Sequence, residues 1–171
     1  QYSEAMYKAI LASGFRFPEP GSGILMSVRD SDKPDLVPLA YRLFSLGFGL
    51  YATGGTANYL IKHGIPCNAV RKVEEGNPHV LDLIQSGKIR LLINTETHSG
   101  MLSGFNGFRL RRRAIEQGIA TVTSLDTLVA VTECLKRGLR ETDLNPCEIR
   151  SFAAMVSDSR NNRLPLHEMP L

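Results

Sequence analysis

The chain has 171 residues, of which 43% are hydrophobic and 22% charged, and its formal net charge at pH 7 is +3. This composition is ordinary for a soluble globular protein, and the charge is too small to indicate a nucleic-acid-binding protein. Three widely spaced cysteines indicate neither a disulfide framework nor a zinc site. No signal-peptide pattern opens the chain and no apolar run approaches the roughly 20 residues of a membrane span, so we expect a cytoplasmic protein.

The pattern of apolar residues divides the chain into three segments. Residues 1–22 predict a lead-in helix and an extended, proline-containing connector, which we expect to follow an upstream domain. Residues 23–138 contain regularly alternating strand and helix patterns. Residues 139–171 lose this pattern apart from one short helix at about 147–156, and we expect them to form an appendage of unknown role.

The segment 23–138 predicts a doubly wound parallel sheet. Short apolar runs typical of strands lie at residues 23–28, 48–51, 65–70, 89–93 and 119–122. Helical patterns follow them at residues 33–46, 56–62, 78–84, 108–117 and 124–137, and a glycine-dotted loop is expected over 95–107. Strands that alternate with helices through short connections indicate a three-layer, flavodoxin-like α/β architecture with five parallel strands.

The turn Thr53-Gly54-Gly55-Thr56 joins the second predicted strand to the helix after it. Glycine lets the backbone turn sharply and lets a ligand come close. The first turn of a helix offers unpaired N–H groups and partial positive charge to an anion such as phosphate. Thr53 or Thr56 is expected to cap the helix and to present a hydroxyl to a phosphate oxygen. By itself the motif is weak, and an ordinary capped turn explains it slightly better than a ligand site.

Polar residues follow four of the predicted strands. In an open parallel sheet, ligands bind outside the carboxyl ends of the strands, so these residues should converge. They are mostly hydroxyls, amides and cations, namely Ser27, Arg29, Asp30 and Lys33, then Thr53, Gly54, Gly55 and Thr56, then Arg71 and Lys72, and finally Asn94, Thr95, Glu96, Thr97 and Ser99. Each one alone is explained as a solvated or capping side chain. The converging set favours a site for a phosphorylated small molecule.

The histidines and acidic residues form no convincing catalytic or metal-binding group. His63, His79, His98 and His167 are spread over a helix end, a first turn, a loop and the tail. The basic run 109–113 would indicate nucleic acid only with aromatic partners and a larger charge excess. We expect its arginines to spread over several faces of a helix, with some of them binding carboxylates. The chain is therefore predicted to hold no metal or cofactor and to bind neither nucleic acid nor membrane.

The same residues resemble a known family. The matching segments, in order and spacing between about residues 3 and 138, are SVRDSDK (27–33), LYATGGTA (50–57), KVEEGNPH (72–79), LLINT (91–95) and LRR (110–112). By these motifs the chain resembles the methylglyoxal-synthase-like domain that ends the large subunit of carbamoyl phosphate synthetase. The resemblance implies that fold and a regulatory role, in which a nucleotide effector such as UMP (an inhibitor) or IMP (an activator) changes the synthetase's activity elsewhere.

The resemblance also implies site residues and partners. Carried over by motif, the residues that contact the effector, mainly its phosphate, are Ser27, Lys33, Thr53, Thr56, Lys72 and Asn94. Gly54, Gly55 and Thr95 are added to the expected site because they also follow the carboxyl ends of predicted strands. The implied partners are the remainder of the large subunit and the glutaminase small subunit. ATP, Mg or Mn, and the synthesis of carbamoyl phosphate from bicarbonate and glutamine-derived ammonia, for pyrimidine and arginine biosynthesis, would lie outside this chain.

The chain departs from the family pattern after the fourth strand, where Asn-Thr-Thr-Ser-Gly is replaced by the longer NTETHSG (94–100). A carboxylate at Glu96 would repel a phosphate unless it turns away or pairs with Lys72. Either the register shifts and Thr97 substitutes, or the effector differs. In ureagenic relatives the effector is N-acetylglutamate and a tryptophan lies near the third-strand loop. This chain has no tryptophan and keeps Lys72, which favours a phosphate ligand.

Three other functions are alternatives to an effector-binding regulatory domain. Methylglyoxal synthase shares the fold and eliminates phosphate from dihydroxyacetone phosphate with an aspartate base. Here Asn77 stands in that place, and an amide cannot serve as a general base. The cyclohydrolase domain of late purine synthesis shares the turn, but its Lys-Thr-Leu-His-Pro stretch is absent. A free-standing binding module with a separate partner would require an ordered tail.

Overall fold

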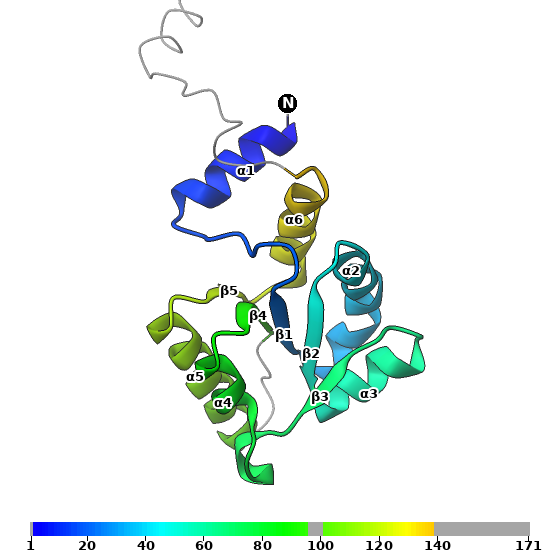
Figure 1. Cartoon of the computed structure of the whole chain (residues 1–171), viewed down its shortest axis with the longest axis vertical. Helices are drawn as coiled ribbons and strands as arrows, with labels where there is room; N and C mark the ends of the chain where they lie inside the picture. Colours follow the sequence, from blue (N-terminus) through cyan, green and yellow to red (C-terminus); the bar gives the residue numbers. More distant parts are fainter. Residues whose placement is uncertain (1, 96–100, 139–171) are drawn as a thin grey trace, which may run out of the picture. The chain divides into compact units, whose positions relative to one another are not determined.

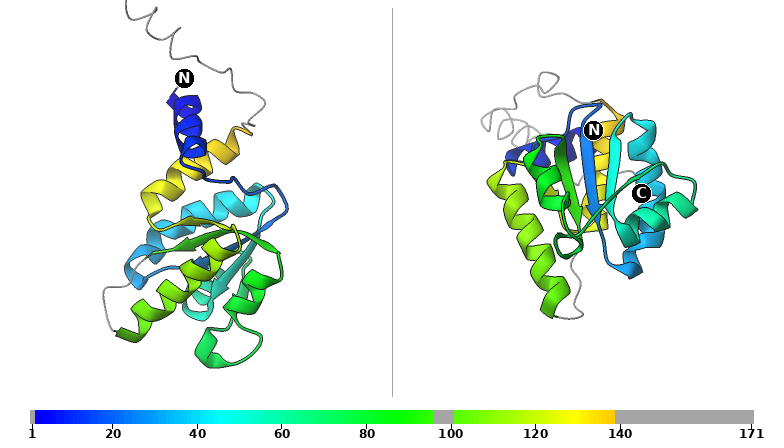
Figure 2. Two further views of the ribbon diagram at one scale, coloured as in Figure 1. Left: turned by 90° about the vertical axis from the view of Figure 1, so that its left-hand side faces the viewer. Right: turned by 60° about the horizontal axis from the view of Figure 1, so that its bottom comes forward.

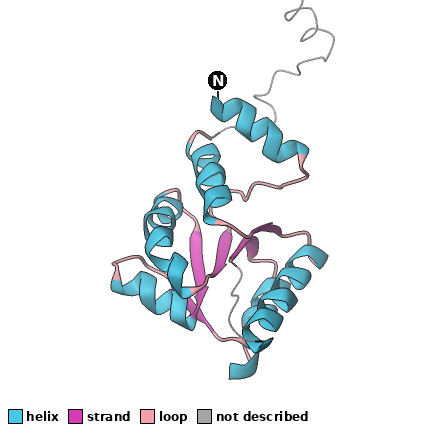
Figure 3. Ribbon diagram, turned by 180° about the vertical axis from the view of Figure 1, so that it is seen from behind, coloured by secondary structure: helices cyan, strands magenta, loops and turns pink. Residues whose placement is uncertain are grey.

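A computed structural model describes residues 2–95 and 101–138, in which a five-stranded sheet lies between two layers of helices (Figure 1, Figure 3). The strands are β1 (Gly23–Ser27), β2 (Gly49–Thr53), β3 (Asn68–Val70), β4 (Ile89–Asn94) and β5 (Ala120–Val122). Neighbouring strands are all parallel, in the order β3-β2-β1-β4-β5. The winding therefore reverses between β1 and β4, which is where such sheets bind ligands.

The two faces of the sheet carry separate layers of the core (Figure 2). Ile24 and Met26 of β1 pack against one layer, whereas Leu25 between them packs against the other. The first layer is built by α2 (Lys33–Ser45), α3 (Gly54–Lys62) and α6 (Leu125–Lys136), and the second by α4 (Val80–Gln85) and α5 (Met101–Glu116). Burying one such side chain stabilises the fold by about 1.5–3 kcal/mol. The predicted three-layer architecture is confirmed.

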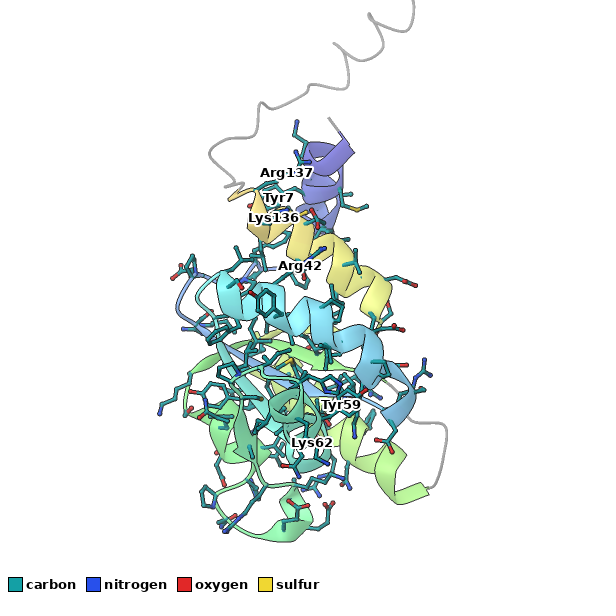
Figure 4. All side chains as sticks on the ribbon, turned by 90° about the vertical axis from the view of Figure 1, so that its right-hand side faces the viewer. Tyr7, Arg42, Tyr59, Lys62, Lys136 and Arg137 are labelled. Atoms are coloured by element: carbon teal, nitrogen blue, oxygen red, sulfur yellow. The ribbon has the colours of Figure 1, made fainter. Side chains whose placement is uncertain are left out.

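The lead-in helix α1 (Tyr2–Ala12) packs against α6 within a compact unit of residues 1–139. Tyr7 is buried where the two helices meet (Figure 4). Its ring stacks on Phe17 of the connector, with 4.6 Å between the ring centroids. The helix and connector therefore share one aromatic contact, while the proposed domain boundary at residue 22 stays a prediction.

The expected loop over 95–107 is wrong in its second half, because α5 already begins at Met101. The prediction treated the glycines of this stretch as helix breakers. Gly107 instead lies inside α5, where an added Cβ would lie 3.2 Å from Arg111 Nη1 and 3.3 Å from Asn94 Oδ1. A glycine inside a helix costs about 1 kcal/mol relative to alanine, and here it allows the helix to approach the end of β4 closely.

Smaller shifts in element boundaries have local causes. β3 begins at Asn68 rather than residue 65, since Pro66 cannot donate to the strand ladder. α4 begins after His79, whose backbone N–H donates to Asp82 Oδ2 at 2.8 Å while its Nδ1 accepts from the Asp82 N–H at 3.4 Å. His79 and Asp82 thus form a reciprocal helix cap. The helix expected at 147–156 lies outside the described residues.

Gly23→Ala is expected to destabilise the fold. A Cβ at Gly23 would lie 2.8 Å from the backbone oxygen of Lys88 and 2.9 Å from Ile89 Cδ1, and overpacking of this kind costs about 1–3 kcal/mol. Gly49 is its partner in the β1–β2 register, and a Cβ there would meet only Tyr51 Cε2, at 3.5 Å.

Urea unfolding measures this difference. The midpoint should fall for Gly23→Ala and change little for Gly49→Ala, with the same m-value in both. Equal midpoints in the two variants would contradict the close approach at Gly23.

Candidate anion-binding site

A cleft of about 780 Å³ opens at the carboxyl ends of β1, β2 and β4. Of the nine residues assigned to the effector site by motif and position, all except Gly54 line the cleft, namely Ser27, Lys33, Thr53, Gly55, Thr56, Lys72, Asn94 and Thr95. Part of α5 forms the opposite wall with Asn106, Gly107, Leu110 and Arg111. The structure therefore brings together residues that are up to about 80 positions apart in the sequence, because parallel strands end at one edge.

Lys33 points its ammonium group at the first turn of α3. A Cβ added at Gly55 would lie 3.3 Å from Lys33 Nζ, and the same nitrogen is 6.0 Å from the centroid of the Tyr59 ring. The Lys33 side chain is only 13% exposed. The first-turn N–H groups of a helix have no intrahelical partner and carry partial positive charge. The ammonium and the helix terminus thus attract an anion to the same place.

The threonine hydroxyls tie strand ends together. Thr53 occupies the N-cap position of α3, but its side chain makes no capping hydrogen bond and donates instead to Ser27 Oγ at 3.2 Å. The hydroxyl of Thr56, which is buried, accepts a hydrogen bond from the Val28 N–H at 3.4 Å. Capping by Thr53 was therefore a wrong expectation. Because the Thr53 hydroxyl bonds to Ser27, the backbone N–H groups in the first turn of α3 can donate to another acceptor.

Asn94 is held from both sides at the floor of the cleft. Its Nδ2 donates to the backbone oxygen of Ser27 at 2.8 Å, and its Oδ1 accepts from Arg111 Nη1 at 2.7 Å. The amide is almost fully buried, at 4% exposure. Asn94 therefore joins β1 to α5, and the second hydrogen on its Nδ2 is the group that could still bind a ligand.

Two aspartates balance the cations near the cleft. Asp30 Oδ1 lies 2.7 Å from Lys33 Nζ. The hydrogen bond and charge of Lys33, together with the charge of Lys72, hold the pKa of Asp30 below its usual value. Burial alone would raise the pKa of Asp32, but its hydrogen bonds outweigh that effect and lower the pKa. The strongest of these bonds comes from Arg29, whose Nε is 2.7 Å from Asp32 Oδ1, so this guanidinium is already paired.

Apolar side chains also line the cleft. They come from the start of α4, from α5 and from the 3₁₀ turn after β3, with Val73, Val80, Leu81 and Leu110. The hydroxyl groups come from the ends of β1 and β2 and the start of α3, whereas Lys72 lies next to the 3₁₀ turn and Arg111 on α5. The cleft thus combines a polar region with an apolar wall, as ligand sites commonly do.

Some predicted residues lie elsewhere. Arg71 does not line the cleft, and its Nη1 donates to the backbone oxygen of Asn77 at 3.2 Å. Glu96, Thr97 and Ser99 lie outside the described residues. In the basic run, Arg112 and Arg113 bind Glu116 at 3.0 and 3.3 Å, as expected for arginines that pair with carboxylates.

Arg111 is the site residue that the sequence analysis missed. The sequence shows it as a member of the basic run and of the LRR segment (110–112), and neither pattern assigns it a contact in the site. The signal that could have found it is the spacing of Gly107 and Arg111, which places both on one face of a helix. That signal becomes readable only when the helix is known to begin before Gly107.

Within residues 2–95 and 101–138, no three His, Cys, Asp or Glu side chains are grouped so as to hold a metal ion. None of the helices in this described part could span a bilayer.

A doubly wound parallel sheet with a cleft at its carboxyl edge is an α/β architecture in which small ligands commonly bind at that edge. Residues 35–123, just over half of the chain, match the family model described as the MGS-like domain. The chain belongs to this family, which confirms the resemblance found in the sequence.

The chain is similar in sequence to one known protein and in fold to another. The chain is 43% identical over 135 residues to the C-terminal section of the carbamoyl phosphate synthase large chain of Methanopyrus kandleri. This match covers 79% of the chain and 24% of that protein, so the chain spans about a quarter of its length. A methylglyoxal synthase from Elizabethkingia anophelis has the same fold, with a TM-score of 0.55 and 14% identity. That match covers 86% of this chain and 95% of the other.

Gly55→Ala is expected to weaken anion binding. The added Cβ would lie 3.3 Å from Lys33 Nζ, so the ammonium group must shift by a few tenths of an ångström. Part of its hydrogen bond to an anion, worth about 1.5–3 kcal/mol when complete, should then be lost. Gly54→Ala is the matched control, because a Cβ there meets nothing within 4 Å and Gly54 does not line the cleft.

Titration with inorganic phosphate, followed by NMR of the backbone amides, measures this effect. Both substitutions raise helix propensity, so a difference between them reports on the site. Equal phosphate affinities in the two variants would remove Gly55 from the anion site.

Proposed function

We propose that this chain is a regulatory domain of a carbamoyl phosphate synthase large chain and that its cleft binds a phosphorylated effector of the UMP or IMP type. The assignment to that enzyme rests on the 43% identity to a section of one such large chain. The effector site rests on one observation. Lys33 Nζ lies against the first turn of α3, in the same cleft as the hydroxyls of Ser27 and Thr53.

The polar part of the cleft suits a phosphate monoester. Such a group carries about −1.5 to −2 charge and three strong acceptor oxygens. Lys33 and Lys72 supply positive charge, and the first turn of α3 supplies N–H donors. Ser27 Oγ accepts from Thr53, so the hydroxyl hydrogen of Ser27 remains for a phosphate oxygen. The donors and charges thus match the group that they would hold.

The apolar part suits a nucleobase. A base presents two flat apolar faces with polar atoms only at its rim, which fits a wall formed by Val73, Val80 and Leu110. Asn106 lines the same cleft and supplies polar groups for that rim. The volume, about 780 Å³, lies within the range of about 300–1,000 Å³ that is usual for small-molecule sites. A nucleotide therefore fits better than a bare sugar phosphate.

In this proposal the chain senses a metabolite and the rest of the enzyme performs the reaction. ATP with Mg or Mn, bicarbonate and glutamine-derived ammonia would be handled by the remainder of the large chain and by a glutaminase small subunit. The product would serve pyrimidine and arginine biosynthesis. The effector can regulate only by its difference in affinity for two states of the whole enzyme, and a tenfold difference corresponds to about 1.4 kcal/mol.

Calorimetric titration of the 171-residue chain with UMP, IMP and ribose 5-phosphate tests the site. We expect at least one nucleotide to bind more tightly than ribose 5-phosphate. Lys33→Ala should weaken nucleotide binding by about tenfold or more, and Thr53→Ala by about two- to tenfold, because it loses a neutral hydrogen bond. Lys62→Ala removes the same charge from the exposed last turn of α3 (Figure 4) and should leave the affinity nearly unchanged.

Two results would contradict this function. One is the absence of binding at millimolar nucleotide. The other is an equal loss of affinity in Lys33→Ala and Lys62→Ala, which would assign the effect to net charge alone.

The fold leaves methylglyoxal synthase activity as the rival function, and the charges of the cleft argue against it. Within the described residues, Asp30 is the only carboxylate that lines the cleft, and Lys33 lowers its pKa. A carboxylate with a lowered pKa is a weak general base. We expect no release of methylglyoxal from dihydroxyacetone phosphate above the spontaneous rate, in an assay where an authentic synthase serves as the positive control. Turnover by this chain would restore the rival function.

A further inference from the structure

Asp30 presents a carboxylate to the ammonium group that a bound phosphate would need. Its Oδ1 lies 2.7 Å from Lys33 Nζ, and the two residues are three positions apart, Asp30 in the 3₁₀ turn before α2 and Lys33 at the first position of α2. Both line the same cleft, as does Lys72, whose charge also acts on Asp30. In the ligand-free chain, the anion site therefore already contains an anion that belongs to the protein.

The two partners of this ion pair are held very differently. The Lys33 side chain is 13% exposed and lies between Gly55 and the Tyr59 ring, whereas the Asp30 side chain is 94% exposed. Lys33 is thus fixed by its packing, while Asp30 can rotate into water without losing any packing contact. Because the Asp30 carboxylate stays solvated, its pairing with Lys33 gains little net free energy, and a phosphate that brings more charge can replace it at Lys33.

We propose that Asp30 is an internal competitor for the anion site: its carboxylate occupies Lys33 when the cleft is empty and must give way when a phosphorylated ligand binds. This inference rests on the proposed function of the cleft. Asp30 would then lower the affinity of the cleft for every anionic ligand. Each such ligand has to displace the Asp30 carboxylate from Lys33 and then bind beside its negative charge. A ligand with a single, weakly bound negative charge gains little free energy when it replaces the Asp30 carboxylate at Lys33.

Asp30→Asn tests the proposal, because it removes the competing charge and keeps the size of the side chain. The 171-residue variant should bind UMP or IMP, and inorganic phosphate, about three- to tenfold more tightly than the unmodified chain at low ionic strength. The gain should shrink at about 1 M salt, where the Debye length is about 3 Å. Asp35→Asn is the matched control, since it changes the net charge equally on α2 but does not line this cleft. It should raise affinity less than Asp30→Asn.

Each outcome decides the matter. Tighter binding by Asp30→Asn alone supports the competitor. Binding that only Asp30→Asn shows, with none by the unmodified chain at millimolar nucleotide, contradicts the proposed function on which the competitor rests. If the unmodified chain binds nucleotide and Asp30→Asn binds no more tightly, or more weakly, the competitor is refuted and the proposed function stands. If neither chain binds nucleotide or phosphate, both proposals fail. Equal gains in the two Asn variants would refute the competitor and assign the effect to net charge.

Discussion

The pairing of β1 with both of its neighbours positions the whole site. Ser27 is the register partner of Asn94 on β4, and Met26 is the partner of Ala52 on β2, so Ser27 and Thr53 end their strands side by side. A shift of one residue in either register would turn buried side chains to the opposite face, which the two-sided core does not permit. The hydrogen bonds of Thr53 and Asn94 to Ser27 then follow from the register, and α3 begins directly after Thr53.

This part of the structure could be predicted from the sequence because it depends on periodicity. Alternating strand and helix patterns imply parallel strands, and parallel strands bring their following residues to one edge. The sequence therefore predicts that Lys33, Thr53 and Asn94 lie together. It does not predict the place of Arg111, because that place depends on a glycine that packs inside a helix, and Gly107 looks the same in a sequence as a glycine that ends one. The sequence also does not predict the cap formed by His79 and Asp82, because histidine is an uncommon N-cap residue.

The ligand-free cleft is a network of satisfied charges. Lys33 is paired with Asp30, Arg29 with Asp32, and Arg111 with the amide of Asn94. Under the proposed function, an anion binds there by exchange of partners, so its affinity would be a difference between two sets of contacts rather than the strength of one set. Preorganisation comes from the buried members, Thr53, Thr56 and Asn94, while the exchange involves the exposed ones.

The lengths of the two edge strands have a consequence for how copies of the domain meet. β3 and β5 contain three residues each, and the segment before β3 contains Pro66. An edge strand is a template for pairing with another chain, and a short edge offers few unpaired N–H and C=O groups. Strand exchange between copies, and the aggregation that follows from it, are therefore disfavoured at both ends of the sheet. Contacts with neighbouring domains are left to the outer faces of the helices, where side chains rather than backbone groups decide the partner.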